Sequence, residues 1–116
     1  MTASLKTIPE LVAEIRLNMR CLSAAEARKE ITKNHGLFID VREPAEVAES
    51  PAPGSINIPR GIIEMRILEQ HPDPNVPIYI HCATGARASL AAEQLSRLGY
   101  KQVTCITCGL EGVCAS

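Results

Sequence analysis

The sequence lacks an excess of charge of either sign, with 12 Lys and Arg against 13 Asp and Glu and a formal net charge of −1. This near-balance removes the electrostatic case for a dedicated nucleic-acid binder, which needs a basic surface to neutralise phosphates. It also lacks any apolar run near the ~20 residues that a membrane-spanning helix requires. Residues 1–10 contain no apolar core of the kind found in signal peptides. We therefore expect a cytoplasmic protein with no nucleic-acid or membrane partner.

The sequence also lacks an even number of cysteines: it contains five in 116 residues. An odd number does not suggest a complete disulfide framework, and thiols stay mostly reduced in the cytoplasm. Hydrophobic residues make up 46% and charged residues 22% of the chain, which is ordinary globular composition. The length suits one domain. Because the cysteines are odd in number and expected to be reduced, one reactive cysteine is a better interpretation than five structural ones.

Helical and strand patterns alternate along the chain. Helical spacing predicts helices over residues 8–19, 23–35, 44–50, 61–70 and 87–98, with Gly36 and Gly99 as stops for the second and the last. Short apolar runs predict strands over residues 37–41, 55–58, 76–80 and 102–106, with Pro77 confining the third to its later residues. This alternation indicates an α/β fold with a mostly parallel sheet between helical layers.

The segment from Ile78 to Arg87 carries the clearest chemical signal. Cys82 follows a predicted strand, at the sheet edge where open α/β proteins usually place their sites. Small residues follow it, and Gly85 can adopt the left-handed backbone that lets a loop curl into a nest of N–H donors. The next helix adds its positive end. Such donors favour a nucleophilic thiolate at Cys82, and Arg87 offers a permanent positive charge for an anionic substrate.

Several motifs then resemble the single-domain rhodaneses, a family of sulfurtransferases. They are the strand end at residues 38–43, the Gly-Ser-Ile-Asn-Ile-Pro segment that starts at Gly54, the six-residue loop 82–87, and the helix that follows it. The resemblance implies a rhodanese-like three-layer fold over residues 1–116. Residues 1–22 are expected to be a helical extension packed on that domain.

The resemblance also implies a mechanism. Cys82 would take a sulfane sulfur from thiosulfate or a related persulfide donor and pass it to cyanide or to a thiol or protein acceptor, without metal or cofactor. Backbone N–H groups of the loop would cradle that sulfur; its residues are Ala83, Thr84, Gly85, Ala86 and Arg87. Two alternatives stay open: a non-catalytic binding or sulfur-carrier module, and a Cdc25-type phosphatase or arsenate reductase. The Cdc25-type phosphatases and arsenate reductases use five residues between cysteine and arginine, whereas this loop has four.

Other residues are weaker candidates. Asp40 and Arg42 are expected to brace the loop, and Arg60 to lie at the pocket rim, where its charge would attract anions. Cys105 and Cys108 form a Cys-x-x-Cys pair, but a zinc site needs about four ligands and no second pair matches. We interpret Cys105 as a buried strand residue, Cys108 as a small turn residue or a sulfur relay, and Cys114 as a packing or surface thiol.

Overall fold

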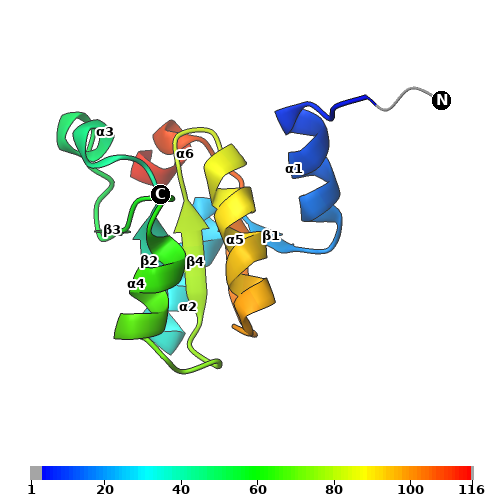
Figure 1. The fold of residues 1–116 in the computed structure, drawn as a ribbon. Helices are drawn as coiled ribbons and strands as arrows, with labels where there is room; N and C mark the ends of the chain where they lie inside the picture. The colour runs from blue at the N-terminus through cyan, green and yellow to red at the C-terminus, as the bar shows by residue number, and fades with distance from the viewer. Residues whose placement is uncertain (1–3, 116) are drawn as a thin grey trace.

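A single parallel sheet forms the centre of the computed structural model, which describes residues 4–115 (Figure 1). Its strands lie in the order β1-β5-β4-β2-β3, and every pair is parallel. They are β1 (Arg20–Leu22), β2 (Leu37–Asp40), β3 (Ile56–Asn57), β4 (Ile78–His81) and β5 (Val103–Ile106). The helices are α1 (Ile8–Leu17), α2 (Ala24–Asn34), α3 (Pro44–Glu49), α4 (Ile63–Gln70), α5 (Ala86–Leu98) and α6 (Leu110–Ala115). The expected α/β class with helices around a parallel sheet is confirmed.

Alternating side chains of the strands build two apolar layers. Ile78, Ile80 and Cys82 lie in the layer covered by α4 and α5, whereas Tyr79 lies in the layer covered by α2 and α6. Figure 1 shows α4 and α5 in front of the sheet and α2 behind it. All four residues of β4 are buried, as expected for a central strand with helices on both faces. The core therefore fixes the end of β4, where the candidate loop 82–87 begins.

Local sequence signals set the ends of the helices. The predicted capping box at Ser23 and Glu26 is present at the start of α2. That helix ends at Asn34 and its C-cap is His35, whose φ of 57° is left-handed, so the predicted stop at Gly36 is off by one residue. Gly36 is needed for space instead, because a Cβ there would sit 2.9 Å from a Tyr79 ring carbon. Helix α5 has a left-handed glycine at each end, Gly85 and Gly99.

Two elements differ from the sequence expectation. β1 was not predicted, because three residues at a sheet edge are too short for a strand pattern to stand out. α6 was not predicted either, because it has only six residues and Gly112 among them weakens a helical pattern. The remaining boundaries differ from the predicted ones by one to two residues, the usual uncertainty of helix and strand ends.

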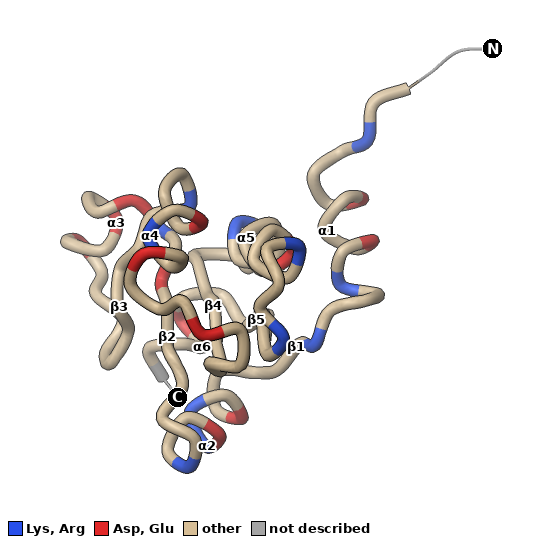
Figure 2. Tube along the Cα trace, turned by 60° about the horizontal axis from the view of Figure 1, so that its bottom comes forward, with Lys and Arg blue, Asp and Glu red and all other residues tan. Residues whose placement is uncertain are grey.

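Charge is spread over the described surface. Figure 2 shows acidic and basic positions interspersed along α1 and α2 rather than gathered into one-sign faces. Exposed pairs such as Lys6–Glu14 and Arg20–Glu30 account for part of this pattern. Within residues 4–115, no helix combines the length and apolar character needed to cross a bilayer.

Candidate active site

The side chain of Cys82 lies at the carboxyl end of β4 and is fully buried. Its Sγ accepts a hydrogen bond from the Gly85 N–H at 3.0 Å and another from the Ala88 N–H at 3.4 Å. Both donors belong to the loop that leads into α5 and to that helix's first turn, whose free N–H groups carry the positive end of the helix dipole. The backbone is therefore arranged to stabilise negative charge on this sulfur.

Gly85 makes this curled loop possible. Its φ of 94° is in the left-handed region, where a side chain would be strained. Its carbonyl accepts a hydrogen bond from the Ser89 hydroxyl at 2.8 Å, which ties the loop to the next turn of α5. On the other side, the Leu110 N–H donates to the Ala83 carbonyl at 2.9 Å, so the segment before α6 packs on the loop. Thr84 is the most exposed of the loop residues.

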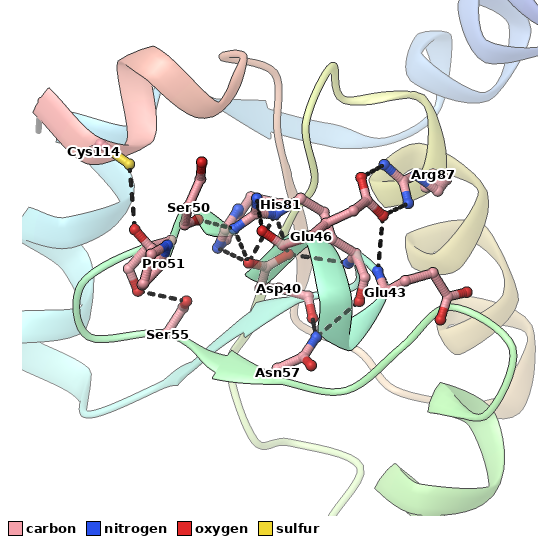
Figure 3. Close-up of polar contacts among 12 residues, drawn as sticks. Asp40, Glu43, Glu46, Ser50, Pro51, Ser55, Asn57, His81, Arg87 and Cys114 are labelled. Carbon is pink, nitrogen blue, oxygen red and sulfur yellow. Dashed lines mark hydrogen bonds and ion pairs between the residues drawn. The ribbon is translucent and has the colours of Figure 1, made fainter. Parts of the chain in front are cut away.

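Arg87 makes an ion pair that the sequence did not predict. Both of its terminal nitrogens donate to the Glu46 carboxylate of α3, at 2.6 and 2.9 Å (Figure 3). The hydrogen bond from Arg87, followed by one from the Glu43 N–H, lowers the pKa of Glu46 to about 2, and Glu46 in turn raises the pKa of Arg87. The positive charge expected to face a substrate is thus already compensated at the rim of the loop.

Asp40 and Arg42 support that rim from beneath. Both are buried, and the guanidinium contacts both carboxylate oxygens, at distances of 2.8 to 3.1 Å. Arg42 also donates to the carbonyls of Ser50 and Glu46, at 2.7 and 3.4 Å, which anchors the helix that carries the Glu46 side chain. The expected bracing pair therefore acts on α3, and through Glu46 on Arg87. Within residues 4–115, neither Asp40 nor Arg42 hydrogen-bonds to Cys82.

His81 precedes the candidate nucleophile but lies on the opposite face of the sheet. Its ring packs 5.0 Å from the Phe38 ring, and neither ring nitrogen has a hydrogen-bond partner in the described part of the chain. Burial lowers the pKa of His81 to about 4, even though Asp40, 3.9 Å away, opposes this effect. His81 is therefore a neutral packing residue near pH 7.

None of the remaining candidates hydrogen-bonds to the sulfur of Cys82 within the described residues. Arg60 pairs with Glu64 of α4 at 3.1 Å, rather than with a loop residue. Cys105 is buried against the Ser89 hydroxyl, and burial raises the pKa of its thiol. Cys108 accepts a hydrogen bond from the Ala24 N–H at 3.3 Å, and Cys114 is exposed near the Pro51 carbonyl. Within residues 4–115, no three His, Cys, Asp or Glu side chains gather in a way that could hold a metal.

Sequence reasoning missed three polar residues around the loop. Glu46 binds Arg87 across 41 positions of sequence, and Arg16 of α1 donates to Ser89 across 73. A signal for Glu46 did exist, because it lies three residues after Glu43 and completes a capping box. No local pattern pointed to Arg16.

Fold and loop together define a class of protein: an α/β domain that holds a cysteine sulfur in a nest of N–H groups after its central strand. The comparison with known families agrees, since the model of the Rhodanese-like domain matches residues 23–116. The chain belongs to this family, and the resemblance seen in the motifs is confirmed.

Relatives with known names include sulfurtransferases. A "Sulfurtransferase" from Allochromatium vinosum is 37% identical over 67 residues, which cover 58% of this chain and 61% of that protein. Alignments with the curated relatives span 38 to 61% of their lengths, so the chain corresponds to less than two thirds of each.

Two solved structures are also similar to the whole domain. The homodimeric polysulfide-sulfur transferase of Wolinella succinogenes shares 29% identity at a TM-score of 0.76, covering 88% of this chain and 77% of that one. A Rhodopseudomonas palustris protein of unknown function, described as a possible tyrosine phosphatase, shares 28% identity at a TM-score of 0.75, covering 94% and 90%.

Proposed function

We propose that this protein is a sulfurtransferase that carries a sulfane sulfur as a persulfide on Cys82. The observation that carries the proposal is the pair of backbone N–H groups, from Gly85 and Ala88, directed at the buried Sγ. An N–H nest suits a sulfur that must bear negative charge both before and after transfer. We expect this chemistry in a reducing compartment such as the cytoplasm.

The first half-reaction would load the cysteine. The Cys82 thiolate attacks the outer sulfur of thiosulfate, the bond between the two donor sulfurs breaks, and sulfite leaves with the bonding electron pair. The product is the anionic persulfide Cys82–S–S⁻. Polysulfide or a protein persulfide can replace thiosulfate in the same scheme, with a shorter polysulfide or a thiolate as leaving group.

The second half-reaction would unload it. An acceptor such as cyanide attacks the terminal sulfur, thiocyanate departs, and the Cys82 thiolate is restored without net oxidation or reduction. A thiolate acceptor reacts in the same way and becomes a persulfide. The loop N–H groups would hold the sulfur in both steps, and Gly85 would keep them pointed inward.

The Cys-x₄-Arg spacing supports sulfur transfer over phosphate chemistry, because a phosphatase of this architecture uses one more residue to surround a tetrahedral oxyanion. The ion pair between Arg87 and Glu46 supports the same choice, since it occupies the guanidinium that a phosphatase would use to bind phosphate. Phosphatase activity therefore serves as a competing outcome in the test.

The test is the intact mass of the reduced protein after incubation with thiosulfate, with Cys82→Ser as the matched variant. We expect a gain of one sulfur atom in the wild type only, reversed by cyanide with release of thiocyanate. A gain with a polysulfide or protein persulfide, but not with thiosulfate, would assign a carrier role with a different donor. No gain with any donor, together with hydrolysis of an aryl phosphate that needs Cys82, would overturn the proposal in favour of a phosphatase.

A further inference from the structure

Arg16, in the last turn of α1, reaches the active loop from outside the matched family domain. Its Nε donates to the Ser89 hydroxyl at 3.1 Å. Its Nη2 lies 2.6 Å from the point that a Cβ on Gly85 would occupy, closer than a side chain there would permit. The guanidinium therefore packs on the backbone of residue 85, and it can do so only because that residue is glycine.

The contact is close to the candidate nucleophile. Gly85 donates its N–H to the Cys82 Sγ at 3.0 Å, so the residue that the guanidinium covers is the same one that holds the sulfur. Ser89 completes the link by donating to the Gly85 carbonyl at 2.8 Å. Helix α1 packs against α5 (Figure 1), and α5 covers the sheet layer that contains Cys82.

The charge of Arg16 is not neutralised as that of Arg87 is. Arg87 is held by both carboxylate oxygens of Glu46, whereas Arg16 makes one hydrogen bond, to a neutral hydroxyl, and has no ion pair among residues 4–115. Glu14, on the same helix, pairs with Lys6. Loop positions 83–86 carry no charge. Arg16 is half-buried, which weakens the screening of its charge by solvent.

Resting on the proposed function, we propose that Arg16 is a specificity-determining residue for sulfur transfer. Its guanidinium lies on Gly85, the residue that donates to the Cys82 Sγ, and supplies an uncompensated positive charge that draws in an anionic donor such as thiosulfate. The charge of Arg87, by contrast, is compensated by Glu46. Helix α1, although it precedes the matched residues 23–116, is then part of the active site.

Charge-selective alkylation tests this proposal without relying on sulfur transfer. Iodoacetate and iodoacetamide both alkylate a thiolate with loss of iodide, but only iodoacetate is an anion. The rate of each reagent at Cys82 is measured by peptide mass spectrometry in the wild type, Arg16→Gln and Arg16→Lys. Arg97→Gln is the matched control, because it removes the same charge from an exposed position at the far end of α5.

We expect Arg16→Gln to lower the ratio of iodoacetate to iodoacetamide rates by about three- to tenfold, the size expected when one partly screened charge near the reacting sulfur is removed. Arg16→Lys should retain most of the ratio, and Arg97→Gln should leave it unchanged. A purely structural role for Arg16 would change both rates together, so an unchanged ratio in Arg16→Gln would overturn the proposal.

Persulfide formation separates this inference from the proposed function. If thiosulfate loads Cys82, Arg16→Gln should raise the KM for thiosulfate by a similar factor with little change in kcat. A fall in kcat with KM unchanged would count against a role in donor capture. If the alkylation ratio falls as expected but no donor forms a persulfide in the wild type, the charge effect stands and the sulfurtransferase proposal fails.

Discussion

Gly85→Ala offers a sharp test of how the loop works, because α5 supplies its own control. Both glycines at the ends of that helix are left-handed, with φ of 94° at Gly85 and 113° at Gly99. A Cβ at Gly99 would meet no atom within 4 Å. At Gly85 it would lie 2.6 Å from Arg16 Nη2 and 3.5 Å from the Thr107 carbonyl oxygen. The two alanine variants therefore share the backbone strain and differ in what surrounds the new methyl group.

Strain sets the expected loss of stability in both variants. An L-residue in the left-handed region costs roughly 1–2 kcal/mol. For a domain of this size, each kcal/mol lowers Tm by about 4 °C. The extra contact in Gly85→Ala adds little to the free energy of unfolding, because the end of the Arg16 side chain can move away. We therefore expect both variants to fold, with Tm lowered by about 4 to 8 °C.

The rate of sulfur loading should separate Gly85→Ala from Gly99→Ala. In Gly85→Ala, relief of the strain rotates the N–H that donates to the Cys82 Sγ at 3.0 Å, and the methyl group displaces the guanidinium of Arg16. We expect persulfide formation from thiosulfate, followed by intact mass, to slow by at least about tenfold, the effect of losing one hydrogen bond to a charged group. Gly99→Ala should load at the wild-type rate.

Two results would refute this reasoning. Wild-type loading by Gly85→Ala would mean that the loop N–H groups do not control the sulfur. Equal slowing by Gly99→Ala would attribute the defect to general loss of stability. Thermal unfolding of both variants, followed by circular dichroism, fixes the stability difference against which the rates are compared.

Three further substitutions test the surroundings of the loop. Asp40→Asn leaves Arg42 buried without its carboxylate and should cost about 3–5 kcal/mol in urea unfolding; a loss below about 1 kcal/mol would contradict the bracing role. The pKa of His81 is about 4 in the fold against 6.5 unfolded, so between these values only the unfolded chain takes up the proton and stability falls as pH falls. His81→Leu should flatten that slope, and an unchanged slope would count against a neutral buried imidazole. Burial raises the pKa of Cys105, so Cys105→Ala should load sulfur at the wild-type rate, and a failure to do so would give Cys105 a part in the transfer.

The sequence predicted the fold and indicated a candidate nucleophile for a shared reason. Apolar runs such as residues 37–39 and 78–80 belong to strands covered by helices on both faces, so their pattern is local and strong. Cys82, Gly85 and the start of α5 are also contiguous, so the loop could be recognised from six residues. The central position of β4 needed the structure, because no local pattern encodes strand order.

The partners of the loop could not be predicted because they come from distant parts of the chain. Arg87 was expected to face an anionic substrate, and only the fold shows that Glu46 of α3 takes that place. Arg16 looked like one more polar residue of an amphipathic helix until α1 packed beside α5 and brought it to Gly85. In both cases the sequence shows that the residue is charged, but only the fold shows which group it contacts.

These contacts make the loop depend on residues that never touch the sulfur. Asp40 holds Arg42, Arg42 holds the backbone of α3, and Glu46 of that helix holds Arg87. On the other side of the loop, Ser89 and Gly85 hold Arg16. One guanidinium is compensated and the other is not, so the electrostatic field at Cys82 is uneven. An anionic donor should therefore approach from the α1 side, where the guanidinium of Arg16 has no carboxylate partner among residues 4–115.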